Sequence, residues 1–250
     1  MKRSDSFELF AHLFKDVHVW PFDKLREEQV ARVVRAVKDS GLTYLSDSKI
    51  ASLISECRAA AKNARGGKFI EAGCALGGST VLIASLLPRA AELHVYDTFA
   101  GMPPPTEQDT PDVHERFRVI ASGDSVGIDG GVYYGYRNDL LESVRRTLDE
   151  HLPATTARRV KLIKGLVQNT MIDADRVAFA HIDVDWYDPV LHCARSIFPR
   201  LNVGGAMIFD DYLDYGSCRK AVDEYFAPYQ GVISIDVSAG SWCVRKLAEI

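Results

Sequence analysis

The sequence lacks the features of a membrane protein, a secreted protein and a nucleic-acid-binding protein. Its 250 residues carry a formal net charge of −4, so there is no basic excess that would attract nucleic acid. No apolar run reaches the ~18 residues that a membrane-spanning helix requires. The first residues, MKRSDSFELFAHLF, also lack the uninterrupted apolar segment and the cleavage site of a signal peptide. We therefore expect neither a nucleic-acid nor a membrane partner.

The five cysteines follow no pattern of a disulfide framework or a zinc site. They are odd in number and scattered, and no C-x-x-C pair occurs among them. Such cysteines are typical of reduced thiols in a cytosolic protein, so we expect a cytoplasmic location. The cysteines are Cys57, Cys74, Cys193, Cys218 and Cys243.

Short apolar segments alternate with amphipathic ones over most of the chain. Two helices are expected over residues 22–40 and from about Ser46 to Gly66, so residues 1–65 should form a helical extension. Over residues 66–250 the alternation predicts an α/β domain, a parallel sheet with helices on both faces and an antiparallel last strand. The seven expected strands cover residues 68–73, 92–97, 159–165, 176–183, 204–211, 231–237 and 241–247.

Residues 98–137 interrupt this alternation. They are rich in Gly, Pro, Asp and Tyr, which predicts a long loop or lid rather than another strand and helix. Asn138 is then expected to cap a helix that carries Leu141, Val144 and Leu148 on one face.

Four acidic residues fall where expected strands end. Glu71, Asp97, Asp183 and Asp210 each close one strand of the expected parallel set. Ligands of open α/β sheets bind beyond the carboxyl ends of the strands, and parallel strands bring those ends to one rim. We therefore expect the four side chains to gather around one ligand site.

The segment EAGCALGGST, residues 71–80, predicts a strand–loop–helix turn. Gly73 and Gly77 permit a close approach of the backbone to a ligand, although a plain tight turn would use glycine as well. Ala75 stands where the dinucleotide motif G-x-G-x-x-G requires glycine, and no P-loop lysine follows, which disfavours a phosphate ligand. Asp97 can accept hydrogen bonds from both hydroxyls of a ribose. These features suit S-adenosylmethionine (SAM) and the Rossmann-like fold of class I methyltransferases.

Two further motifs, HIDVDWYD and FDDY, place acids at neighbouring strand ends. Residues i and i+2 of an extended strand share a side, so Asp183 and Asp185 should face the same way, beside Asp210 and Asp211. Carboxylates so close together repel one another unless a cation lies between them. Because no Cys/His set accompanies them, Mg²⁺, Mn²⁺ or Ca²⁺ fits better than zinc. Alternatively the acids cap the following helices, as we expect of Asp188.

These motifs resemble, in order and spacing, the macrocin O-methyltransferase family. Its members are SAM- and Mg²⁺-dependent enzymes that methylate sugar hydroxyls on macrolides, aminocoumarins and related bacterial natural products. The resemblance implies a glycoside substrate, a role in antibiotic biosynthesis and a homodimer or larger homo-oligomer. It covers about residues 22–230 and rests on FIEAGCALGGST, YDTFAGMPPP, HIDVDWYDPV, GGAMIFDDY and CRKAVDEYF.

The resemblance also implies a role for each matching residue. Residues of the first loop are expected at the methionine end of SAM, namely Glu71, Ala72, Gly73, Gly77, Ser79 and Thr80. The ribose is expected at Asp97, with Thr98 and Phe99 beside it. Three acids are expected to bind the metal, namely Asp183, Asp210 and Asp211. Asp185 is the expected general base, because a carboxylate that already binds a metal is a weaker base, with Asp183 as the alternative.

Three other functions remain open at this point. A catechol-type O-methyltransferase uses the same metal chemistry on an aromatic diol. An NAD oxidoreductase shares the sheet, but the missing glycine and the acid cluster count against it. A regulator that binds SAM or metal without catalysis is the third. The long segment 122–139 is expected to shape the acceptor site, where Phe99, Tyr133, Tyr134, Tyr136, Trp186 and Tyr212 are candidates to stack on an aglycone.

Overall fold

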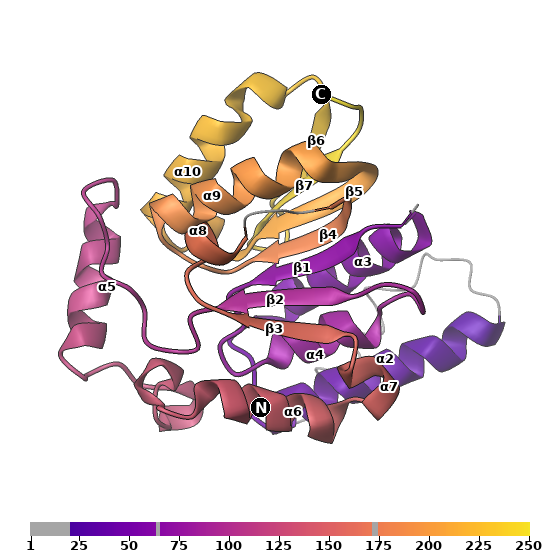
Figure 1. Ribbon diagram of the computed structural model, residues 1–250, viewed down its shortest axis with the longest axis horizontal. Coiled ribbons are helices and arrows are strands. Elements are labelled where there is room, and N and C mark those ends of the chain that lie inside the picture. The colour runs from indigo at the N-terminus through magenta and orange to yellow at the C-terminus, as the bar shows by residue number, and fades with distance from the viewer. Residues whose placement is uncertain (1–20, 64–65, 172–174) are drawn as a thin grey trace.

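The computed structural model describes residues 21–63, 66–171 and 175–250 (Figure 1). Within them one seven-stranded sheet has the order β3-β2-β1-β4-β5-β7-β6. Strands β1 to β5 pair in parallel, and β7 is antiparallel to both β5 and β6. The predicted seven-stranded, mostly parallel sheet is thus confirmed. Its strands are β1 (Lys68–Ala72), β2 (Leu93–Asp97), β3 (Val160–Lys164), β4 (Val177–Ile182), β5 (Leu201–Phe209), β6 (Ile233–Asp236) and β7 (Trp242–Lys246).

Helices cover both faces of the sheet, as the alternation predicted (Figure 1). One face packs against α2 (Pro21–Asp39), α3 (Asp47–Asn63), α4 (Gly78–Ser85), α6 (Leu140–His151) and α7 (Ala154–Ala157). The other packs against α8 (Val167–Thr170), α9 (Tyr187–Ile197) and α10 (Gly216–Phe226). The strand order reverses direction between β1 and β4, and such a switch point is where α/β sheets open a ligand crevice.

The two N-terminal helices belong to the same hydrophobic core as the sheet. Val34 and Val37 of α2 and Ile50, Ile54 and Cys57 of α3 are buried in one cluster with residues of β1, β2 and β4. Burying one such side chain contributes about 1.5–3 kcal/mol, which explains why the 3.6-residue spacing seen in the sequence forms helices here. Both predicted helices are confirmed, and residues 1–20 of the expected extension lie outside the described residues.

The expected loop of residues 98–137 contains a helix, so that prediction was wrong in part. Helix α5 (Pro111–Ala121) begins with Pro111 in its first turn, where a missing N–H costs nothing. It buries Val113 and Ile120, which lie two turns apart on one face. In Figure 1, α5 stands beyond one end of the sheet, and its first turn contacts α10, where the Gly216 N–H donates to Asp112 Oδ2 at 2.8 Å. Short turns η1 (Ile128–Gly130) and η2 (Tyr134–Tyr136) follow it.

Two expectations from composition can be compared with the structure. All five cysteines are free, and each is buried. Among the described residues, no helix combines the length and the apolarity that crossing a membrane requires.

The helix expected after residues 98–137 is α6, which begins at Leu140. Its N-cap is Asp139 rather than the expected Asn138, and it buries Val144 and Leu148 as expected.

Candidate active site

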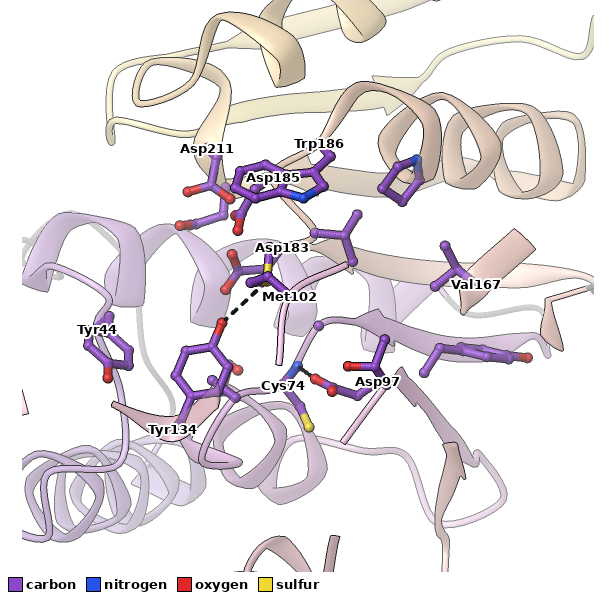
Figure 2. Close-up of a pocket in the computed structure, with 18 of the residues that line it drawn as sticks. Tyr44, Cys74, Asp97, Met102, Tyr134, Val167, Asp183, Asp185, Trp186 and Asp211 are labelled. Carbon is purple, nitrogen blue, oxygen red and sulfur yellow. Dashed lines mark hydrogen bonds between the residues drawn. The ribbon is translucent and has the colours of Figure 1, made fainter. Parts of the chain in front are cut away.

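A cavity of about 490 Å³ opens at the carboxyl ends of the parallel strands. This volume is within the ~300–1,000 Å³ of typical small-molecule sites. Its wall comes from the ends of β1, β2, β4 and β5, from residues 42–45 between α2 and α3, and from residues between 98 and 134. Figure 2 shows Asp97 and Cys74 together, and the acids Asp183, Asp185 and Asp211 in another part of the pocket. We call these regions the Asp97 side and the acid side.

On the Asp97 side, the backbone of the first loop is pressed against the end of β4. Gly73 has φ +81°, and a Cβ there would lie 1.8 Å from the carbonyl oxygen of Asp183. The Asp183 N–H donates to the Ala72 carbonyl at 2.8 Å, which locks the two strand ends together. A side chain at residue 73 is therefore excluded by both conformation and space, and this is the physical reason for the glycine.

Asp97 organises the same loop through its carboxylate. Its Oδ2 accepts a hydrogen bond from the Cys74 N–H at 2.8 Å, and its Oδ1 accepts one from the Phe99 N–H at 2.7 Å. Burial raises the pKa of Asp97, while these backbone donors oppose the rise. Each carboxylate oxygen has a second lone pair, so the side chain can still accept a hydroxyl from a ligand in the cavity.

The predicted cofactor residues fall into two groups. Gly73, Ser79, Asp97 and Thr98 line the cavity. The others are not on its wall: Glu71, Ala72, Gly77, Thr80 and Phe99. For Glu71 the reason is visible, because Thr80 Oγ1 donates to its Oε2 at 2.5 Å and His181 Nδ1 lies 3.3 Å from its Oε1. Glu71 therefore stabilises the loop through contacts outside the cavity. Direct contact of these five residues with SAM stays a prediction.

On the acid side, Asp183, Asp185 and Asp211 each offer a carboxylate oxygen within 4.8 Å of the others. The predicted gathering of acids at neighbouring strand ends therefore occurs, but by a different local geometry. Strand β4 ends at Ile182, and Asp185 has φ +56°, in the left-handed region. The assumption that an extended strand continues through Asp185 was wrong. A left-handed residue costs about 1–3 kcal/mol, and such strain concentrates at functional sites.

Asp210, the third predicted metal ligand, faces a different set of partners. Lys49 Nζ donates to Asp210 Oδ2 at 2.9 Å, and Ser241 Oγ donates to Oδ1 at 3.0 Å. His181 Nε2 lies 3.9 Å from that same Oδ1. Burial opposes ionisation of Asp210, but the neighbouring His181 and Lys49 lower its pKa. Asp210 lines the cavity, yet it belongs to a second acidic group with Asp211 and Asp214 rather than to the first.

The charges on the acid side are poorly compensated. Burial, followed by the charges of Asp211 and Asp210, raises the pKa of Asp183. Burial and the charge of Asp185 raise the pKa of Asp211, whose Oδ2 is buried without a hydrogen-bond partner. Burial raises the pKa of Asp185 to about 6. A buried, unpartnered carboxylate oxygen beside two more carboxylates is the environment that a divalent cation relieves.

Aromatic side chains cover the acid side. Of the six aromatics proposed from the sequence, Tyr133, Tyr134 and Trp186 line the cavity. The other three do not, and Tyr212 instead donates to Asp223 at 2.8 Å. Tyr134 points its hydroxyl toward Met102 Sδ at 3.7 Å, close to Asp183 in Figure 2.

Sequence reasoning missed several residues of the wall, namely Tyr44, Lys49, Met102, Arg116, Asp214 and Tyr215. All but Met102 stand outside the motifs that guided the prediction, and Met102 lies within YDTFAGMPPP without having been given a role. Residues 42–45, which connect the two N-terminal helices, also line the cavity.

Residues 23–243 match the family model described as macrocin O-methyltransferase (TylF). The chain belongs to the macrocin O-methyltransferase family. This match spans most of the chain and confirms the resemblance that the five motifs predicted.

Two curated relatives have comparable similarity to the chain. Demethyldecarbamoylnovobiocin O-methyltransferase of Streptomyces niveus is 27% identical over 191 residues, which are 70% of this chain and 65% of that protein. The 8-demethyl-8-(2,3-dimethoxy-alpha-L-rhamnosyl)-tetracenomycin-C 4'-O-methyltransferase of Streptomyces olivaceus is 27% identical over 173 residues, 65% of this chain and 59% of that protein. The chain thus spans less than two thirds of the length of either relative.

Solved structures share the fold at lower identity. The O-methyltransferase NovP aligns with a TM-score of 0.66 at 21% identity and 83% coverage of both chains. Calicheamicin methyltransferase CalS11 aligns with a TM-score of 0.58 at 17% identity, covering 92% of this chain and 94% of that one. These alignments confirm the predicted class I methyltransferase fold.

Proposed function

We propose that the protein is a SAM-dependent, divalent-metal-dependent O-methyltransferase that acts on a sugar hydroxyl of a glycosylated natural product. One observation carries this proposal: a single cavity contains the Asp97 carboxylate, suited to accept ribose hydroxyls, in one part and three clustered carboxylates in another. Membership in the macrocin O-methyltransferase family supports the reaction class. The relatives' names, one of which contains a rhamnosyl group, support the substrate class.

The Asp97 side would bind SAM. Asp97 would accept the ribose hydroxyls, and the backbone at Gly73, which lines the cavity, would lie beside the methionine part. Glu71 would keep the loop in place through Thr80 and His181. When bound, SAM supplies an electrophilic methyl group, and a divalent cation supplies positive charge that lowers the pKa of a nearby hydroxyl.

The acid side fits a hard divalent cation. Asp183 and Asp211 belong to both the predicted ligand set and the trio of oxygens within 4.8 Å of one another, so these two would hold it. The unpartnered Oδ2 of Asp211 is the atom most in need of a cation. All donors of the trio are carboxylate oxygens, which suits Mg²⁺, Mn²⁺ or Ca²⁺.

Asp185 would act as the general base. Its carboxylate lines the cavity beside Asp183 and Asp211, at the turn where φ is +56°. A pKa of about 6 leaves Asp185 ionised at neutral pH while keeping it basic enough to accept a hydroxyl proton. Trp186 and Tyr134 would pack against the sugar or its aglycone and exclude water from the reacting hydroxyl.

The test is mass spectrometry of reactions with SAM and a panel of deoxysugar glycosides and catechols, with Mg²⁺ and with excess chelator. We expect a glycoside to gain the mass of one methylene only when the metal is present. Preferential methylation of catechols would replace the sugar substrate with an aromatic diol. A product that persists under full chelation would refute the metal dependence.

Two further measurements test the remaining expectations. A melting temperature that NAD raises and SAM does not would favour the NAD oxidoreductase. Size-exclusion chromatography would test the expected homo-oligomer.

A further inference from the structure

Asp109 is a buried carboxylate that the proposed mechanism does not use. It stands just before α5 and is only 9% exposed, yet it is not among the residues that line the cavity. Its Oδ1 accepts the Tyr187 N–H at 2.8 Å, from a residue 78 positions further along the chain. Its Oδ2 accepts the Thr106 N–H at 2.8 Å. Both oxygens therefore have partners, and one partner belongs to the first turn of α9.

Tyr187 is the first residue of α9 and closely follows the proposed base in the chain. The first N–H groups of a helix have no partner within the helix, and a side chain at the N-cap usually accepts one of them. The N-cap here is Trp186, whose indole can donate a hydrogen bond but cannot accept one. Asp109 supplies the acceptor from a distant part of the chain, and the helix dipole favours a carboxylate at this position.

The turn beside this contact has an unusual backbone. Asp185 has φ +56°, and the Trp186 N–H donates to the Val184 carbonyl at 2.6 Å. A non-glycine residue in the left-handed region persists only where its surroundings hold it there. Strand β4 fixes the chain before the turn, and the bond from the Tyr187 N–H to Asp109 fixes it after the turn. Together they set the direction of the Asp185 side chain, which lines the cavity (Figure 2).

Neighbouring hydrogen bonds join the same two segments. Trp186 Nε1 donates to the Pro103 carbonyl at 2.9 Å, and Thr106 Oγ1 donates to Asp188 Oδ2 at 3.0 Å. The segment between β2 and α5 is thus bound to the segment between β4 and α9 at several points. Among these contacts, the one at the Tyr187 N–H lies on the backbone itself, directly after the turn.

We propose that Asp109 is a positioning residue that holds the turn at Asp185 in the conformation needed for proton transfer. It acts through the backbone of Tyr187 and does not touch the substrate. Removing its carboxylate leaves the first N–H of α9 without its acceptor, so the left-handed turn can relax and carry the Asp185 carboxylate away from the acceptor hydroxyl. This inference rests on the role of Asp185 in the proposed function.

Nuclear magnetic resonance of the chain labelled with ¹⁵N-tyrosine tests the contact without any substrate. The Tyr187 amide, assigned through Tyr187→Phe, should exchange with solvent about tenfold faster in Asp109→Ala, as expected when a hydrogen bond to a charged group is lost. Asp109→Asn, which keeps the shape but not the charge, should show a smaller increase, and it decides the question if Asp109→Ala does not fold. Unchanged exchange of this amide would overturn the inference.

The matched control is Asp112→Ala. Asp112 makes the same kind of contact at another helix, because its Oδ2 accepts the Gly216 N–H at the start of α10 at 2.8 Å. Asp112→Ala should leave the exchange of the Tyr187 amide unchanged. Equal acceleration in Asp112→Ala and Asp109→Ala would overturn the inference, because a general loosening of the segment would then explain both.

The kinetic test is a double-mutant cycle with Asp185→Asn. Its readout is the single-turnover rate on the glycoside or catechol of the panel that wild type methylates best. Asp109→Ala should lower this rate by about 10²-fold, the cost of a misplacement of about 1 Å, with the Kd for SAM nearly unchanged. In the Asp185→Asn background it should lower the remaining rate little further, because both changes remove the same interaction.

Two kinetic results would overturn the inference. One is an equal loss of rate from Asp109→Ala in both backgrounds, which a merely structural role would give. The other is a rate equal to that of wild type. If wild type methylates no acceptor of the panel, the proposed function fails, while the exchange of the Tyr187 amide still shows whether Asp109 holds the turn.

Discussion

The Asp97 side and the acid side of the cavity differ in how their carboxylates are compensated. On the Asp97 side, both oxygens of Asp97 accept backbone N–H groups, and Gly73 fits against β4 with no room to spare. On the acid side, Asp183 and Asp211 have raised pKa values and one oxygen of Asp211 has no partner. In the first region the hydrogen bonds of Asp97 are already made, whereas the second contains the unpartnered oxygen that the proposed cation would bind. Substitutions in the two regions should therefore affect different ligands.

The largest expected effect follows from removing the proposed base. Asp185→Asn should lower turnover by about 10²–10⁴-fold, the usual contribution of positioned base catalysis. The affinities for SAM and Mn²⁺ should change little if Asp185 accepts the proton, as proposed, and binds neither ligand. Single-turnover mass spectrometry gives the rate, and calorimetry gives the two affinities. If Asp185→Asn loses Mn²⁺, then Asp185 is a metal ligand and Asp183 becomes the candidate base.

The next largest effect tests the close packing of the Asp97 side. Gly73→Ala introduces strain at φ +81° and a Cβ only 1.8 Å from the Asp183 carbonyl oxygen. We expect a loss of about 3 kcal/mol in the free energy of unfolding, since strain and overpacking each cost about 1–3 kcal/mol. Urea unfolding measures it.

The matched control for Gly73→Ala is Gly123→Ala. Gly123 has φ +86°, and an added Cβ there would meet no atom within 4 Å. It should show the conformational cost without the clash, and hence a smaller loss of stability. Equal losses in the two variants would mean that the contact between β1 and β4 is not tightly packed in solution.

A third prediction concerns the pH dependence of stability without metal. The pKa of Asp185 is raised from 3.8 to about 6, so its protonated form favours folding. This contribution is fully present below 3.8 and is lost as the pH rises through about 6. The side chain keeps partial access to the cavity, so we expect a loss of about 2 kcal/mol or less.

The measurement is urea unfolding of wild type and Asp185→Asn over this pH range in excess chelator. Carboxylates outside the cluster titrate in both proteins, so the difference between the two curves reports the Asp185 carboxylate together with its effect on the pKa of Asp211. Wild type should lose stability relative to the variant as the pH rises, and Mg²⁺ should reduce that loss. Parallel curves would contradict the raised pKa of Asp185.

The contrast between the two regions also explains what sequence could predict. The strands and the glycine loop follow from local patterns, because β1 has the short pattern of a buried strand and Gly73 directly follows it. Asp183 and Asp211 could be placed together because parallel strands end at one rim. Lys49 could not, since its partner Asp210 is 161 residues away and no local signal pairs them. The left-handed turn at Asp185 was also hidden, because an Asp after a strand is compatible with several conformations.

The smallest expected effect separates the Asp97 side from the acid side most cleanly. In Asp97→Asn, the amide group replaces one of the oxygens that accept the Cys74 and Phe99 N–H groups, and the negative charge is lost. We expect the Kd for SAM to rise about tenfold, the lower range for a hydrogen bond to a charged group. The Mn²⁺ affinity should not change, because none of the clustered acids contacts this carboxylate. Calorimetry with each ligand measures the two Kd values. If Asp97→Asn weakened Mn²⁺ binding as much as SAM binding, the two regions would be one coupled site.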